Sequence, residues 1–175
     1  MTNNWHVITG GPSVGKTTLL VELEKRGHQT VPEAARLVID EAIASGQTIQ
    51  QIRANEKHFQ HQVMQRKMAI EAALKSDALT FLDRGLHDTI SYLLHNGFSV
   101  EQWIHEAASQ VRYKTVFLLE PLQTYVKDYA RTETKQEVEL LTAALRKVYA
   151  DAGMQPVMVP AIDVDKRADY ILQRI

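Results

Sequence analysis

A glycine-rich stretch near the start of the chain has the residue types and the spacing that bind a phosphate chain. In residues 10–17, GGPSVGKT, the first glycine is followed after four residues by Gly15, Lys16 and Thr17. Glycines let a loop turn several backbone N–H groups towards one anion, a lysine here reaches the β- and γ-phosphates, and the threonine hydroxyl ligates Mg²⁺. The stretch therefore predicts a P-loop; a glycine turn before an ordinary helix is the alternative.

The residues on either side of this stretch favour the P-loop. Residues 5–9 form an apolar run typical of a buried strand, and leucines at helical spacing follow the loop. Strand, glycine-rich loop and helix is the order that a P-loop requires, and the helix N-terminus adds the positive end of its dipole. The residues expected to bind the nucleotide are Gly10, Gly11, Pro12, Ser13, Val14, Gly15, Lys16, Thr17 and Thr18.

The elements that position this loop alternate between strand and helix. The sequence predicts strands at 5–9, 28–31, 78–82, 115–119 and 157–159, and helices at 18–26, 34–44, 48–75, 88–95, 100–110, 136–152 and 163–174. Such alternation predicts an α/β fold with parallel strands and right-handed crossovers. Because ligands bind at the carboxyl ends of these strands, the loop, Glu33, Asp83, Arg84 and Glu120 are expected to share one cleft.

The predicted helix 48–75 contains neither proline nor glycine, and its apolar stripe is interrupted by Glu56 and Arg66. The preferred interpretation places these two charges at exposed edges or in pairs with other side chains. The alternative is that the stripe borders a polar pocket. The closing helix is expected to be capped by Asp163.

Asp83 and Arg84 follow a buried strand, where P-loop proteins place a second acid associated with Mg²⁺. Asp83 is expected to ligate the metal directly or through water, or to act as a base. Arg84 is expected to pair with Asp83 or to bind a phosphate. A turn aspartate and a surface arginine are the alternatives.

Glu33 ends the second predicted strand, where a carboxylate can accept the proton of an attacking hydroxyl. Arg36 lies three residues further on the same helical face, and is expected to orient a substrate or to pair with Glu33. For both, a solvated helix N-terminus is the alternative.

Residues 122–134 carry basic side chains and only a weak apolar face, which suits a lid that closes over phosphates. Arg131 is the best candidate for a charge-stabilising arginine supplied by the same chain, and Lys127 and Lys135 are weaker candidates. A solvated surface helix is the alternative.

Composition narrows the class of protein. The chain has 175 residues, a net charge of −1 and no cysteine, so disulfides and thiol catalysis are excluded. No basic tract suggests a nucleic-acid partner, and no segment is typical of a signal peptide or a membrane span. We expect one cytoplasmic domain over residues 1–175, as a monomer or homodimer. His58 and His61 lack the further ligands that a zinc site needs.

Five stretches resemble a known family: GGPSVGKTTL, VPEAARLVI, LTFLDRGLHDTISYL, DYARTE and the ending VP…DKRADYIL. They resemble the small AAA-domain P-loop ATPases that include the kinase part of bacterial ribosylnicotinamide kinase. The glutamate after the second strand and the Asp-Arg pair after the third are also similar to deoxynucleoside kinases. The resemblance covers nearly the whole chain and implies a P-loop NTPase fold whose five parallel strands are ordered 2-3-1-4-5.

The resemblance also implies roles. Glu33 matches the substrate-side carboxylate or base of those kinases, and Asp83-Arg84 match their acid–arginine pair. Arg131 matches the lid arginine, and Pro160 and the loop towards Arg167 are expected near the adenine.

Three functions follow as hypotheses. The first is a kinase that uses ATP and Mg²⁺ to phosphorylate a hydroxyl of a small, nucleoside-like molecule. The second is a nucleoside-triphosphate hydrolase, in which water replaces that hydroxyl, and the third is an ATP-gated binding module without turnover. A GTP-dependent switch is disfavoured, because Glu120-Pro121 stands where an Asn-Lys-x-Asp signature would follow the fourth strand.

Overall fold

Five short strands form one parallel sheet in the order β2-β3-β1-β4-β5. The strands are β1 (Trp5–Thr9), β2 (Gln29–Val31), β3 (Thr80–Asp83), β4 (Thr115–Leu119) and β5 (Val157–Val159). The computed structural model describes residues 3–121 and 135–175. The expected α/β fold and the strand order implied by the family resemblance are confirmed.

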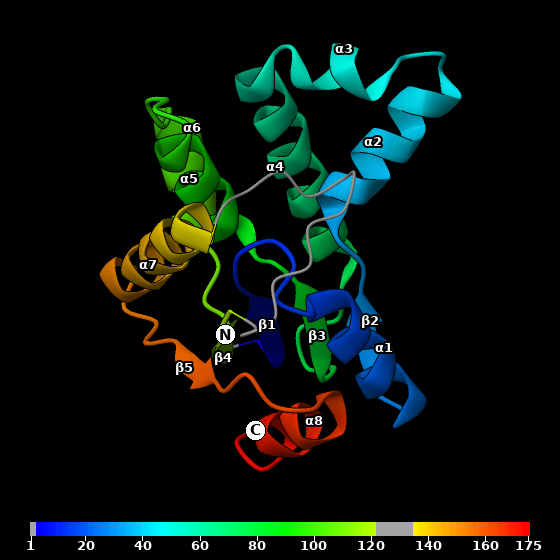
Figure 1. Cartoon of the computed structure of the whole chain (residues 1–175), viewed down its shortest axis with the longest axis vertical. Coiled ribbons are helices and arrows are strands. Elements are labelled where there is room, and N and C mark those ends of the chain that lie inside the picture. The colour runs from blue at the N-terminus through cyan, green and yellow to red at the C-terminus, as the bar shows by residue number, and fades with distance from the viewer. Residues whose placement is uncertain (1–2, 122–134) are drawn as a thin grey trace.

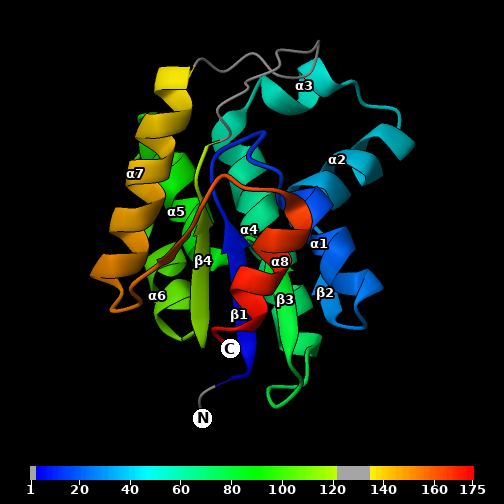
Figure 2. The same ribbon diagram turned by 60° about the horizontal axis from the view of Figure 1, so that its bottom comes forward.

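Helices cover both faces of the sheet (Figure 1). α1 (Lys16–Lys25) and α8 (Val164–Leu172) lie on one face. α4 (Glu56–Ala73), α5 (Leu86–His95) and α7 (Lys135–Asp151) lie on the other, with α6 (Gln102–Ser109) packed against α5. α2 (Ala34–Ala44) and α3 (Ile49–Arg53) extend beyond the edge where the strands end, as Figure 2 shows.

The central strands of the sheet are buried on both faces, as near-continuous apolar strands predict. All five residues of β1 and all four of β3 are buried. The register pairs Ile8 with Asp83 and Leu119 with Val159, so the strands end at one edge. This alignment gathers the loops that follow β1, β2 and β3 into one region of the molecule.

The predicted single helix over 48–75 is wrong. Two helices, α3 and α4, occupy this span, and they are separated at residues 54–55. The Asn55 side chain accepts a hydrogen bond from the His58 backbone N–H at 3.1 Å, and Thr48 caps α3 in the same way through Gln51. Asparagine is favourable at the N-cap of a helix and unfavourable in its interior, because its side chain accepts hydrogen bonds from backbone N–H groups. This preference explains why the helix is broken here without proline or glycine.

Two further expectations concern the second half of the chain. Asp163 stands at the N-cap position of α8 but its side chain makes no capping hydrogen bond; it forms an ion pair with Lys166 at 3.4 Å. The predicted lid at 122–134 lies outside the described residues. Within residues 3–121 and 135–175, no helix has the length and apolar character needed to cross a membrane.

Candidate active site

The loop between β1 and α1 has the backbone of an anion-binding turn. Gly10, Ser13 and Gly15 all have positive φ angles, of 147°, 62° and 90°. A Cβ at Gly10 would lie 2.9 Å from Val14 Cγ2, so a larger residue does not fit there. Successive residues with positive and negative φ turn neighbouring N–H groups to one side, which supports the predicted phosphate loop.

Lys16 is the first residue of α1 and is buried, with 8% of its surface exposed. Its Nζ donates hydrogen bonds to the carbonyl oxygens of Gly11 at 2.7 Å and Gly10 at 3.2 Å. Burial, together with the nearby Arg84 charge, lowers the pKa of Lys16 to about 8. Thr17, by contrast, is exposed and lines a pocket beside the loop.

Glu33 and Arg84 form an ion pair at the ends of β2 and β3. Arg84 Nε donates to Glu33 Oε1 at 2.8 Å, and Arg84 Nη1 donates to the Gly10 carbonyl at 3.0 Å. Burial raises the pKa of Glu33, but Arg84, Lys16 and Lys67 outweigh it and hold the pKa below its ordinary value. Glu33 is therefore an anion at neutral pH.

Asp83 is buried beneath the phosphate loop, and it does not line the pocket. Burial raises its pKa to about 6, against the opposing charge of Lys16. Its Oδ1 has no hydrogen-bond partner in the described part of the chain. A buried carboxylate oxygen without a donor suits a bound cation or a water held by one, so Asp83 and the Thr17 hydroxyl fit Mg²⁺.

Arg84 does not pair with Asp83 as one expectation had it; it pairs with Glu33 and Asp88. Asp88, fully buried in α5, accepts from Arg84 Nη1 at 3.3 Å and from the Gly85 N–H at 3.0 Å. It also accepts from the hydroxyls of Thr9 and Tyr149, each at 2.5 Å.

Sequence reasoning missed the role of Asp88. Two features of the sequence could have indicated it. Asp88 is the third residue of a helix, where an acid can accept from the backbone N–H at the helix start, and it lies four residues after Arg84, at the spacing of a helical ion pair.

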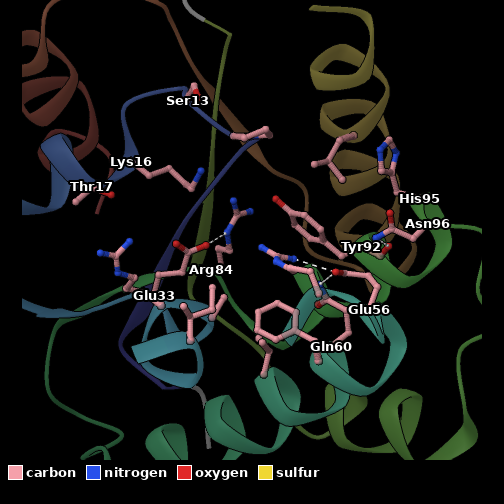
Figure 3. A pocket seen from close by; sticks show the side chains of 18 of the residues that line it. Ser13, Lys16, Thr17, Glu33, Glu56, Gln60, Arg84, Tyr92, His95 and Asn96 are labelled. Atoms are coloured by element: carbon pink, nitrogen blue, oxygen red, sulfur yellow. Dashed lines mark hydrogen bonds and ion pairs between the residues drawn. The ribbon is translucent and has the colours of Figure 1, made fainter. Parts of the chain in front are cut away.

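A pocket of about 1020 Å³ joins the phosphate loop to the Glu33–Arg84 pair. Figure 3 shows Lys16 and Thr17 on one side of it, the ion pair in the middle, and Glu56 and Gln60 across from them. The side chains that line the pocket come from the loop and from α1 to α5 and α7. Several of them had no role predicted from the sequence: Arg53, Phe59, Gln60, Val63, Lys67, Tyr92, His95 and Asn96.

The far wall of this pocket is polar. Glu56 forms an ion pair with Arg53 at 3.0 Å and accepts from Gln60 Nε2 at 2.8 Å. Both charges in the α4 stripe pair with other side chains, as the preferred interpretation expected: Glu56 with Arg53, and Arg66 with Glu41. The alternative also holds at Glu56, because this residue lines the pocket. Phe59 lies beneath Arg53, whose Cζ is 4.4 Å from the ring centroid.

The other predicted residues within the described part of the chain divide into those that line the pocket and those that do not. Pro12, Ser13, Thr18 and Arg36 line the pocket. Arg36 pairs with Asp40 at 3.3 Å and not with Glu33. Gly10, Gly11, Val14, Glu120 and Pro160 do not line it; the first three shape the loop from behind.

Arg131 and Lys127 lie outside the described residues. No cluster of three histidine or acidic side chains suited to a metal ion occurs among residues 3–121 and 135–175, and His61 instead contacts Glu101 at 3.1 Å.

The chain shares its fold with several solved structures. A NadR protein in complex with NR matches with a TM-score of 0.67 and 14% identity, over 90% of this chain and 44% of that chain. A NadR protein in complex with NAD and AMP-PNP matches with a TM-score of 0.68 and 13% identity, over 98% and 49%. The chain therefore spans about half the length of these two proteins.

A deoxyadenosine kinase from M. mycoides with bound dCTP matches over its whole length. Its TM-score is 0.63 with 13% identity, and the match covers 97% of each chain. At identities this low, the likeness shows a shared fold and nothing of the activity. The activity has to be argued from the residues of the site.

A comparison with curated protein sequences finds no match. The family model described as "AAA domain" matches residues 5–167, which includes the phosphate loop, the Glu33–Arg84 pair and Asp88. By this match over nearly its whole length, the chain belongs to the AAA-domain family.

Proposed function

We propose that the protein is a phosphotransferase that moves the γ-phosphoryl group of ATP to a hydroxyl of a small, nucleoside-like molecule. The observation that carries the proposal is the opening of the phosphate loop and the Glu33–Arg84 pair into one pocket of about 1020 Å³. Ligand pockets commonly measure about 300–1,000 Å³, so this one has room for a nucleotide and an acceptor together.

The chemistry follows from the charges of the pocket. The acceptor oxygen forms a bond to the γ-phosphorus, the bond to the β–γ bridging oxygen breaks, and ADP leaves. Glu33, anionic and with 35% of its side chain exposed, receives the acceptor proton. Lys16 stabilises negative charge on the β- and γ-phosphates, and Arg84 holds the Glu33 carboxylate in place.

Magnesium is the expected cofactor, and Thr17 and Asp83 are the residues that would hold it. When bound, Mg²⁺ neutralises phosphate charge and orients the transferring group. The unpartnered Asp83 Oδ1 and the pocket-facing position of Thr17 support this assignment.

The acceptor class is proposed from the far wall of the pocket. Gln60 and the ion-paired Glu56 offer hydrogen-bonding groups, and the half-buried Tyr92 offers an aromatic ring. A molecule with a flat polar ring and a free hydroxyl suits this combination. The fold shared with a deoxyadenosine kinase supports a nucleoside-like acceptor.

The experiment that tests the proposal has two steps. Nucleosides, vitamins and sugars are first screened by thermal shift with a nonhydrolysable ATP analogue, because a ligand of the native state raises the melting temperature. Each hit is then incubated with γ-labelled ATP and Mg²⁺. Label in the acceptor supports the kinase, whereas release of labelled phosphate without acceptor, at about one per second or faster, would identify a hydrolase. Nucleotide-dependent binding with no turnover would identify a binding module.

A further inference from the structure

Arg167, in α8, is a buried arginine at the outside of the phosphate loop, with 3% of its surface exposed. Its guanidinium donates to three backbone carbonyls: Nη1 to Val14 at 2.5 Å, Nε to Pro160 at 2.9 Å and Nη2 to Glu120 at 3.2 Å. These carbonyls belong to the phosphate loop and to the segments that follow β5 and β4. One side chain therefore ties together three loops at the carboxyl edge of the sheet.

No carboxylate in the described part of the chain bonds to the Arg167 guanidinium. Buried Arg84 forms ion pairs with Glu33 and Asp88, but Arg167 forms none with any carboxylate in residues 3–121 and 135–175. Burial lowers the pKa of Arg167, and the Glu120 charge opposes this shift. A buried cation held by carbonyl dipoles alone is costly, and a nearby anion offsets that cost.

The position of Arg167 beside Gly15 shows where such an anion would act. A Cβ built on Gly15 would lie 3.3 Å from Arg167 Nη1, and Gly15 itself lines the pocket. Arg167 does not line the pocket, so it reaches a bound phosphate chain only across the thickness of the loop. Its hydrogen bond to Val14 holds a loop carbonyl outward, which leaves the neighbouring N–H groups for the pocket side.

We propose that Arg167 is a positioning residue of the nucleotide site: it fixes the phosphate loop from outside, and its charge is balanced by the phosphate chain that the loop binds. The inference rests on nucleotide binding by this loop, which is part of the proposed function. It adds a determinant of phosphate affinity that does not touch the ligand.

The test compares two substitutions with a matched control. Arg167→Gln removes the charge, and Arg167→Lys keeps the charge but cannot reach three carbonyls. Arg112→Gln is the control, because Arg112 also donates to a backbone carbonyl, that of Gly153 at 3.0 Å, but on the exposed surface. The probes are ATP, inorganic tripolyphosphate and adenosine, titrated by calorimetry into each protein, with the melting temperature measured alongside.

We expect Arg167→Gln to bind ATP and tripolyphosphate at least about tenfold more weakly, which is about 1.4 kcal/mol. Arg167→Lys should lose about threefold, and Arg112→Gln should bind as the wild type does. Adenosine binding should change in neither Arg167 variant, which separates an effect on phosphates from a general loss of structure.

Four results would overturn the inference. The first is an unchanged affinity of Arg167→Gln for tripolyphosphate, and the second is an equal loss of that affinity in the two Arg167 variants. The third is a loss of that affinity in Arg112→Gln as large as in Arg167→Gln, and the fourth is a loss of affinity for adenosine alone. If Arg167→Gln does not fold, the inference is tested with Arg167→Lys alone. An unchanged affinity of that variant for tripolyphosphate then overturns the inference. Wild-type protein that binds ATP but transfers no phosphoryl group would refute the proposed function and leave this inference standing. Wild-type protein that binds neither phosphate probe would overturn both.

Discussion

Arg84 Nε and Glu33 Oε1 lie 2.8 Å apart, although 51 positions separate the two residues in the sequence. The pair forms because β2 and β3 are neighbours in the sheet and end at the same edge. Arg84 has a positive φ of 68°, an uncommon backbone conformation for a residue with a side chain. Backbone strain of this kind is typical of functional positions.

Glu33→Gln should lower the rate of phosphoryl transfer by about 10²–10⁴-fold, because glutamine cannot accept the acceptor proton. The KM for ATP should change less, since in the proposed site the loop amides and Lys16, and not Glu33, bind the phosphate chain. Steady-state kinetics measures both quantities. Glu22→Gln is the control, because Glu22 forms a comparable pair with Arg26 at 2.8 Å on the far half of α1. Transfer by Glu33→Gln at the wild-type rate would show that Glu33 is not the base.

Asp88→Ala should be strongly destabilising, by about 3–5 kcal/mol in the free energy of unfolding. The substitution leaves the Arg84 charge less compensated and the Thr9 and Tyr149 hydroxyls without their acceptor. Urea unfolding gives the free energies. Tyr149→Phe removes one donor only and should cost about 1 kcal/mol. A loss for Asp88→Ala no larger than that for Tyr149→Phe would contradict the network.

Glu71 should make stability fall as the pH rises from about 4.5 to about 7. Burial raises the pKa of Glu71 from 4.5 to about 7, although Tyr113 donates to its Oε1 at 2.9 Å. The folded protein therefore binds more protons than the unfolded chain in this window, so deprotonation costs stability, on the order of 3 kcal/mol in full.

Glu71→Gln should remove this dependence of stability on pH. The free energy of unfolding of the variant should then equal that of the wild type near pH 4.5 and be larger than it at pH 8. Urea titrations across this range measure the difference, with Glu106→Gln at an exposed helix position as the control. A difference between Glu71→Gln and wild type that does not vary with pH would exclude the proposed titration.

Gly11→Ala should disturb the phosphate loop for a purely steric reason. Gly11 has no positive φ, but a Cβ there would lie 2.8 Å from Val138 Cγ1 in α7. Overpacking of this kind costs about 1–3 kcal/mol. Adding Val138→Ala should recover part of that loss, giving a coupling of about 1 kcal/mol or more in a double-mutant cycle measured by urea unfolding. Additive effects of the two substitutions would refute the contact.

The sequence predicted that residues placed by local rules would share one cleft, and Gly15, Lys16, Thr17, Glu33 and Arg84 do line one pocket. Gly15, Lys16 and Thr17 carry a motif, and Glu33 and Arg84 follow strands whose ends must meet in a parallel sheet. The partners of Arg84 were not predictable in the same way, because they depend on which side chains the helices bring alongside. Asp88 meets Thr9 across 79 positions and Tyr149 across 61.

The division of the span 48–75 was missed for a related reason. The periodicity of apolar residues continues across Asn55, whose side chain accepts from the His58 N–H and caps the start of α4. That break places Arg53 against Glu56 and Phe59, and so builds the far wall of the pocket. The pattern of apolar residues carries no information about such a local capping interaction.

Binding of ATP by the phosphate loop can be measured by calorimetric titration of ATP into the wild-type protein and into Lys16→Met, with and without Mg²⁺. We expect saturable binding at one site in the wild type, stronger with Mg²⁺, and an affinity at least about tenfold lower in Lys16→Met. The absence of saturable binding of ATP to the wild type under both conditions would contradict this expectation.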